Sequence, residues 1–160
     1  MREFRLETVG PIGDCAVLQV AGEVDAYTAP LLREQMRELA AKGAVHLIAD
    51  LSLVDFLDST GLGALVGGLR RLREADGSLA LVISTPRILR IFQITGLTKA
   101  FASQRSVADA ITADPHWQQI AESEAGVVLV RRAHPDRCGR PGRRGAGAGR
   151  GHRGRHRPEP

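Results

Sequence analysis

Residues 56–65 read FLDSTGLGAL, and the period of the apolar residues changes within this stretch. Before it, VHLIADLS at 45–52 is apolar almost without alternation, which is typical of a short strand buried on both faces. After it, apolar residues recur at helical intervals, at Leu62, Leu65, Val66, Leu69 and Leu72. The polar tripeptide Asp58-Ser59-Thr60 therefore lies at a junction between a strand that ends near Ser52 and a helix that starts near Thr60.

Strands and helices alternate along the chain on both sides of this junction. A hairpin of two antiparallel strands is predicted at 4–9 and 15–22, with glycine and proline in the turn between them. A helix follows between Thr28 and Gly43. Further elements are expected as a strand at 78–84, a helix at 86–97, a short strand at 101–103 and a last helix at 106–120 that is interrupted around Pro115. This order predicts an α/β fold in which helices pack on a small mixed sheet of four to five strands.

The chain is long enough for one compact domain. It has 160 residues, of which 43% are hydrophobic and 4% aromatic, so the core is expected to consist of Leu, Ile, Val and Ala. We place this domain at residues 1–113, followed by an extension at 114–130 that is partly helical or irregular. Residues 131–160 are rich in arginine and glycine and have almost no aliphatic bulk, which predicts a disordered tail.

The excess of positive charge belongs to this tail. It holds ten arginines against two acidic residues, a net charge of +8, which leaves −4 for residues 1–130 of the total +4. Arginine can contact the phosphates of nucleic acids, but the tail has none of the aromatic residues on which bases stack. A solvated extension is therefore favoured over nucleic-acid contact, and a non-homologous tail created by a change of reading frame is a third explanation.

Several functional classes find no support in the sequence. The N-terminus lacks a stretch of signal-peptide character, and no run approaches the roughly 20 apolar residues of a membrane span, so a cytoplasmic protein without membrane contact is expected. Cys15 and Cys138 lack metal-ligand spacing, and Cys15 is interpreted as a core residue. His46 is likewise interpreted as a structural residue of its strand. No phosphate-binding glycine motif is present, and neither a cofactor nor a metal is expected.

Two interpretations of the junction remain open. Asp and Ser are preferred helix N-caps, because their oxygens accept unpaired backbone N–H groups, and the loss of a cap costs about 1 kcal/mol. Alternatively, Ser59 is a site of modification. The N-terminus of a helix tolerates a phosphate, which would add about −1.5 to −2 charges beside Asp58 and change the surface without changing the fold.

An enzyme is not indicated. The residues around Ser59 do not match G-x-S-x-G, the strained turn that presents a nucleophilic serine. The carboxylates of Asp50, Asp55 and Asp58 could gather a magnesium ion, but their irregular spacing favours turn and capping roles.

The helix after the junction is rich in glycine. Gly63, Gly67 and Gly68 each weaken it by roughly 1 kcal/mol relative to alanine. A close approach of this helix to the sheet or to a partner is expected to compensate.

Three separated blocks of the sequence resemble one known family. The blocks are GEVDAYTAP at 22–30, VHLIADLS with VDFLDSTGLGALVGGLRR up to residue 71, and ILRIFQITGLTKAF at 88–101. Together they look like the bacterial anti-sigma factor antagonists, which are single STAS domains, with the actinobacterial members most similar. The resemblance runs from about residue 4 to residue 113 and implies the STAS fold for that region.

The resemblance implies a binding protein that takes part in a partner switch. The unphosphorylated antagonist would bind an anti-sigma factor, which is a serine kinase, and so free a sigma factor for transcription. The kinase would phosphorylate Ser59 and release the antagonist, and a PP2C-type phosphatase would reverse the reaction, with no small-molecule substrate involved. The partner-binding residues implied in this way are Asp25, Asp58, Thr60, Gly61, Leu62 and Gly63.

Two alternatives stay open beside this reading. The helix residues of the implied surface, such as Leu62, could all face the sheet instead of a partner. The domain could also be a STAS scaffold module of a larger stress-sensing assembly, without phosphorylation as a switch.

Overall fold

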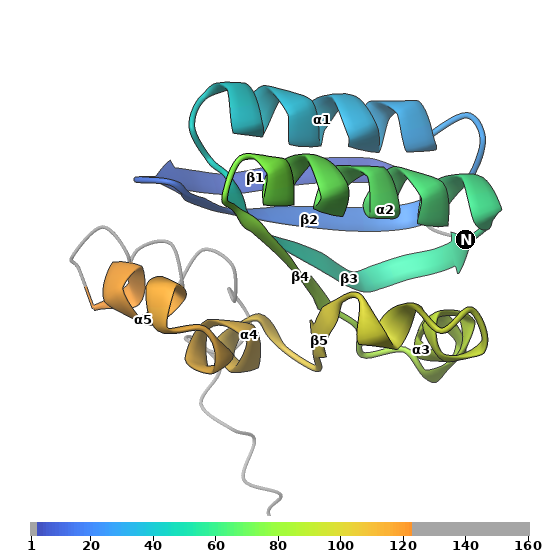
Figure 1. Cartoon of the computed structure of the whole chain (residues 1–160). Coiled ribbons are helices and arrows are strands. Elements are labelled where there is room, and N and C mark those ends of the chain that lie inside the picture. Colours follow the sequence, from blue (N-terminus) through green and yellow to red (C-terminus); the bar gives the residue numbers. More distant parts are fainter. Residues whose placement is uncertain (1–2, 123–160) are drawn as a thin grey trace, which may run out of the picture.

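The computed structural model describes residues 3–122, which form one sheet with helices on both of its faces (Figure 1). The strands are β1 (Arg5–Ile12), β2 (Cys15–Val24), β3 (His46–Leu57), β4 (Ser78–Val82) and β5 (Ala102–Gln104). The helices are α1 (Ala29–Ala41), α2 (Ser59–Glu74), α3 (Pro86–Ile94), α4 (Val107–Ala113) and α5 (Pro115–Ala121), with a short 3₁₀ helix at Leu97–Lys99. The predicted tail and residues 123–130 of the predicted extension lie outside the described residues.

The five strands lie in the order in which they occur along the chain. β1 pairs with β2 in antiparallel fashion, which confirms the predicted hairpin, whereas β2, β3, β4 and β5 are parallel neighbours. Parallel strands need crossover connections, and α1, α2 and α3 provide them. The expected mixed sheet is therefore confirmed, with five strands.

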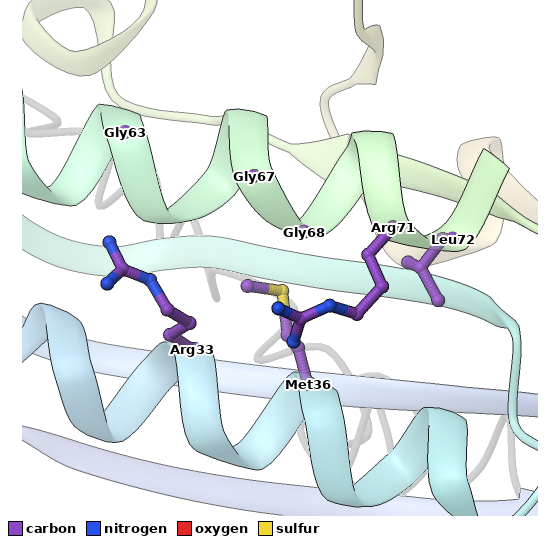
Figure 2. A pocket seen from close by; sticks show the side chains of 7 residues that line it. All are labelled: Arg33, Met36, Gly63, Gly67, Gly68, Arg71 and Leu72. Atoms are coloured by element: carbon purple, nitrogen blue, oxygen red, sulfur yellow. The ribbon is translucent and has the colours of Figure 1, made fainter. Parts of the chain in front are cut away.

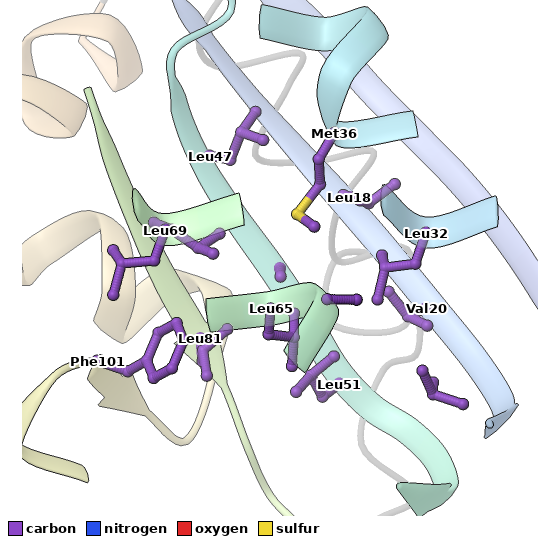
Figure 3. Close-up of a cluster of buried hydrophobic side chains, with 14 of the residues drawn as sticks. Leu18, Val20, Leu32, Met36, Leu47, Leu51, Leu65, Leu69, Leu81 and Phe101 are labelled. Carbon is purple, nitrogen blue, oxygen red and sulfur yellow. The ribbon is translucent and has the colours of Figure 1, made fainter. Parts of the chain in front are cut away.

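α1, α2 and α3 contribute to the larger of two cores. Figure 3 shows Leu32 and Met36 of α1 and Leu65 and Leu69 of α2 directed toward the strands, where Leu51 lies among them. Most of these side chains are fully buried, and removing one such leucine side chain costs about 2–5 kcal/mol. This face of the sheet therefore fixes the position of α2, including its N-terminus.

α4 and α5 cover part of the opposite face. Trp117 of α5 is 1% exposed and packs with Cys15, Val17 and Ile48 of the sheet. Burial raises the pKa of the Cys15 thiol to about 12, and the Asp14 carboxylate adds to this effect. Cys15 is thus a core residue, as expected, and the folded unit continues into the segment after residue 113 that we assigned to the extension.

The boundaries of several elements differ from the predicted ones. β3 does not end near Ser52 but continues to Leu57, because its pairing with β2 extends to the register pair Val24 and Leu57. The interruption expected around Pro115 in the helix predicted at 106–120 is confirmed, because this segment forms two helices, α4 and α5. Asp114 between them is extended, at φ −121° and ψ 115°, and accepts a hydrogen bond from the backbone N–H of His116 at 2.9 Å. Pro115 then begins α5, as its fixed φ and missing N–H allow.

The glycines of α2 are of two kinds. A Cβ atom on Gly68 would lie 2.7 Å from Cε of Met36, and one on Gly61 would lie 2.9 Å from the carbonyl oxygen of Val24. These two glycines allow α2 to lie close to α1 and to the end of β2. Gly63 and Gly67 are exposed, and a Cβ atom there would meet nothing within 4 Å. Close packing inside the domain explains only the first kind.

We expect Gly67→Ala and Gly61→Ala to change the free energy of unfolding in opposite directions. Gly67→Ala raises it by about 1 kcal/mol, because alanine favours the helix and the site is open. Gly61→Ala lowers it by about 1–3 kcal/mol, because the new methyl group overpacks against Leu57 and Val24. Urea unfolding of both variants measures the two changes, and a gain in stability for Gly61→Ala would contradict the packing described for that position.

Candidate functional site

Asp58 is the N-cap of α2. Its backbone is extended, at φ −98° and ψ −177°, and its Oδ1 accepts a hydrogen bond from the backbone N–H of Gly61 at 2.9 Å. Its own N–H donates to the carbonyl oxygen of Val24 at 3.2 Å, which ties the cap to the end of β2. The capping interpretation of the junction is therefore correct for Asp58.

Ser59 does not perform this capping function. It is the first residue of α2 and is exposed, and its hydroxyl makes no hydrogen bond to any residue in the described range 3–122. Thr60 is exposed in the same turn. The first N–H groups of a helix lack intrahelical partners and carry a partial positive charge, so the Ser59 hydroxyl lies at a position that favours an anion.

Asp25 lies beside this turn, because β2 and β3 end next to each other. Val24 and Leu57 are paired in the parallel register, and Asp25 and Asp58 are the residues that follow them. Asp25 Oδ1 accepts hydrogen bonds from the backbone N–H groups of Tyr27 at 2.9 Å and Thr28 at 3.0 Å. The bond from Thr28, together with the others, lowers the pKa of Asp25. Two carboxylates, those of Asp25 and Asp58, therefore follow adjacent strand ends, and Ser59 comes directly after the second.

The remaining predicted binding residues divide between buried and exposed positions. Gly61 is buried against Leu57 and Val24, whereas Leu62 is half-buried and Gly63 is exposed. Gly61 is therefore a packing residue. Leu62 and Gly63 reach the surface one turn after Ser59, so this part of α2 does not face the sheet alone.

A shallow groove of about 140 Å³ between α1 and α2 continues this surface (Figure 2). Gly63, Gly67 and Gly68 of α2 and Met36 of α1 line it, together with two arginines. Figure 2 shows Arg33 extending from α1 toward the turn that holds Gly63, and Arg71 extending from α2 toward Met36. The groove thus combines an uncovered helix backbone with two positive charges.

Two exposed apolar side chains near this end of the sheet were not predicted. Tyr27 is 89% exposed and lies in the loop that Asp25 stabilises, and Phe56 is 48% exposed on the strand that leads to Asp58. The sequence offered a weak signal for Tyr27, the single tyrosine of the chain, inside a polar loop. The exposure of Phe56 could not be predicted, because an apolar run does not indicate which face of the strand is left uncovered.

The magnesium cluster weighed for Asp50, Asp55 and Asp58 does not form. Asp50 accepts hydrogen bonds from the N–H and hydroxyl groups of Ser52, and Asp58 caps α2. Within residues 3–122, side chains of the metal-binding types approach one another closely only at Asp14, Cys15 and His116, at the other end of the strands. In the same range, no helix is both long and apolar enough to cross a membrane.

We expect the stability contributed by Asp25 to depend on pH. The folded-state pKa of Asp25 is lowered, so its stabilisation is present above the ordinary pKa of about 3.8 and is lost as the pH falls through the folded-state pKa. Asp25→Asn should therefore be less stable than wild type at pH 7, with a smaller difference near pH 3. Chemical unfolding at both pH values measures this, and an equal difference at both would show that the charge of Asp25 does not matter.

The chain is similar to known proteins in sequence and in structure. The STAS domain family matches residues 6–110. An anti-sigma-B factor antagonist of Bacillus subtilis is 45% identical over 80 residues, which are 50% of this chain and 72% of that protein.

Two solved structures of related proteins agree with the fold. An anti-sigma factor antagonist from Mycobacterium paratuberculosis is 32% identical, with a TM-score of 0.63 over 69% of this chain and 93% of that one. The Bacillus cell fate determinant SpoIIAA in its phosphorylated form is 26% identical, with a TM-score of 0.54 over 69% of this chain and 98% of that one. The chain therefore belongs to the STAS domain family, as a homologue of the anti-sigma factor antagonists.

Proposed function

We propose that this protein binds an anti-sigma factor through the surface around Ser59, and that phosphorylation of Ser59 ends this binding. The anti-sigma factor is itself the serine kinase that transfers a phosphoryl group from ATP to the Ser59 hydroxyl oxygen, while the hydroxyl proton leaves. A PP2C-type phosphatase removes the phosphate by hydrolysis. Binding of the unmodified form frees a sigma factor in the cytoplasm, so the protein regulates transcription without being an enzyme.

The observation that carries this proposal is the division of tasks between Asp58 and Ser59. Asp58 caps α2 with its own carboxylate, so a change at the Ser59 hydroxyl removes no hydrogen bond within the described part of the chain. A phosphate can therefore be added and removed while the helix stays intact. The unpaired N–H groups of the first turn are suitable partners for its oxygens.

The same phosphate would change the charge of the surface strongly. Asp58 directly precedes Ser59 and Asp25 follows the end of the neighbouring strand, and a phosphoserine adds about −1.5 to −2 charges at pH 7. Desolvating three adjacent anionic groups in an interface is costly unless each of them meets a positive partner. Release of the bound protein follows from this cost without a conformational change.

The surface beside Ser59 has the features of a protein interface. Tyr27 and Phe56 provide exposed aromatic groups, and aromatic residues are enriched at interfaces. Gly63 and Gly67 allow the backbone of a partner to lie close to α2. Arg33 and Arg71 in the groove suit a partner segment with acidic side chains.

The names of the relatives agree with this proposal. The similar protein of Bacillus subtilis is an anti-sigma-B factor antagonist, and SpoIIAA has a phosphorylated form. The serine kinase and the phosphatase of this proposal are inferred from the resemblance of the sequence to the anti-sigma factor antagonists. The similarity to the antagonist of Mycobacterium paratuberculosis supports an actinobacterial relationship.

The switch predicts that Ser59→Ala and Ser59→Asp have opposite binding properties. Ser59→Ala should capture an ATPase of the serine-kinase type from a lysate of the native host containing ATP, because it cannot be phosphorylated. Ser59→Asp should capture at least tenfold less, because a charge is present from the start. The intact mass of the wild-type protein after incubation should increase by one phosphate, mapped to Ser59.

Thr112→Ala is the control, since Thr112 is an exposed hydroxyl residue on α4, on the other face of the sheet. It should be captured and phosphorylated as wild type is. Equal capture by all variants, without phosphate, would contradict the switch and favour a STAS scaffold module of a larger assembly.

The interface itself predicts a steric effect at Gly63. Gly63→Gln adds a side chain to the exposed face of α2 without a clash inside the domain, so stability is kept while binding of the captured kinase falls at least tenfold. Ala113→Gln is the control, because Ala113 is exposed on α4, on the other face of the sheet. Calorimetric titration of both variants tests this, and equal affinities would remove Gly63 from the interface.

A further inference from the structure

A second group of reactive side chains lies at the opposite end of the strands from Ser59. Asp14 and Cys15 stand at the beginning of β2, and His46 stands at the beginning of β3. α5 brings His116 to the same place, although it is 102 residues from Asp14 in sequence. The proposed partner switch uses none of these residues.

The atoms of this group lie close together. Nε2 of His116 is 2.7 Å from Oδ1 of Asp14, and Sγ of Cys15 is 3.5 Å from the same oxygen. One nitrogen, one oxygen and one sulfur atom thus lie within 4.8 Å of one another. In a tetrahedral zinc site with bonds of about 2.0–2.3 Å, ligand atoms are separated by roughly 3.3–3.6 Å. The sulfur already has this separation from the carboxylate oxygen, and the 2.7 Å between that oxygen and Nε2 of His116 must widen by about 0.6 Å.

We propose that Asp14, Cys15 and His116 bind a divalent cation of the zinc class, which fastens α5 to the sheet. Nitrogen and sulfur ligands select zinc or a similar transition metal over magnesium and calcium, which prefer oxygen. On binding, the Cys15 thiol releases its proton to solvent and its sulfur donates an electron pair to the cation. Neutral His116 donates through Nε2, Asp14 through a carboxylate oxygen, and a water molecule completes the tetrahedron.

The surroundings provide both access and orientation. The side chains of Asp14 and His116 are 41% and 38% exposed, so a cation reaches them from solvent, with buried Cys15 beside them. The ring of His46 lies against that of His116, with centroids 4.0 Å apart, and its Nδ1 is 2.9 Å from Oγ of Ser78. The bond to Ser78 orients the His46 ring, and the contact of this ring with that of His116 restricts the orientation of the His116 imidazole.

A cation at this site would hold α5 on the sheet. α5 has seven residues and packs through Trp117 next to His116. Without a cation, the Asp14–His116 hydrogen bond fastens the beginning of α5. With a cation, residues from two segments that are distant in sequence coordinate one ion. α5 then remains docked on the sheet under conditions that would break the hydrogen bond.

Titration with Co²⁺ and Zn²⁺ tests this site in the full-length chain carrying Cys138→Ser, in which Cys15 is the single thiol. Co²⁺ should produce a thiolate-to-cobalt absorption band that Cys15→Ala lacks. At a Zn²⁺ concentration 100 times the dissociation constant, the Tm should rise by roughly 5–10 °C. His116→Gln should weaken Zn²⁺ binding at least tenfold, so that at the same Zn²⁺ concentration the rise in Tm falls to about half or less.

The histidines of the tail supply the control. A variant in which His134, His152 and His156 are all replaced by Gln should keep the cobalt band and the rise in Tm. Absence of the thiolate band from the Cys138→Ser chain would overturn the proposal. Loss of zinc binding in the tail variant, with unchanged binding in His116→Gln, would overturn it as well, because the tail would then be the binding site.

Discussion

The parallel pairing of β2 with β3 is the constraint on which both proposed sites depend. At its carboxyl end, the register pair Val24 and Leu57 sets Asp25 beside Asp58 and starts α2 at Ser59. At its amino end, the pair Cys15 and His46 sets a thiol and an imidazole side by side. At each end of these two parallel strands, the backbone register alone places the paired residues next to each other.

The beginning of α2 shows how a modifiable residue can be kept separate from the stability of the fold. The cap belongs to Asp58, whose carboxylate accepts the N–H of Gly61, while Ser59 remains exposed. If the serine itself were the cap, a phosphate would have to replace a stabilising hydrogen bond. Placing the cap one residue earlier allows the charge of the surface to change while the helix begins at the same residue.

The glycines of α2 allow close packing inside the domain on one side of the helix and leave the helix backbone accessible on the other. Gly61 leaves room for the backbone of Val24, which a side chain there would force away, and Gly68 leaves room for the end of the Met36 side chain, which would have to shift. A Cβ atom at Gly63 or Gly67 would meet nothing within 4 Å, so packing inside the described domain does not offset the cost of these glycines in helix stability. A partner that approaches the helix backbone closely accounts for this second pair.

The sequence by itself determined the kind and order of the elements, because periodicity and turn residues act over a few neighbouring positions. It also indicated the importance of the Asp58-Ser59-Thr60 junction, although it left open which residue forms the cap. The tertiary structure decided the rest: the length of β3, the exposure of Phe56 and the meeting of Asp14 with His116. These features depend on which strand pairs with which and on where α5 packs, and such long-range contacts leave no periodic signal in the chain.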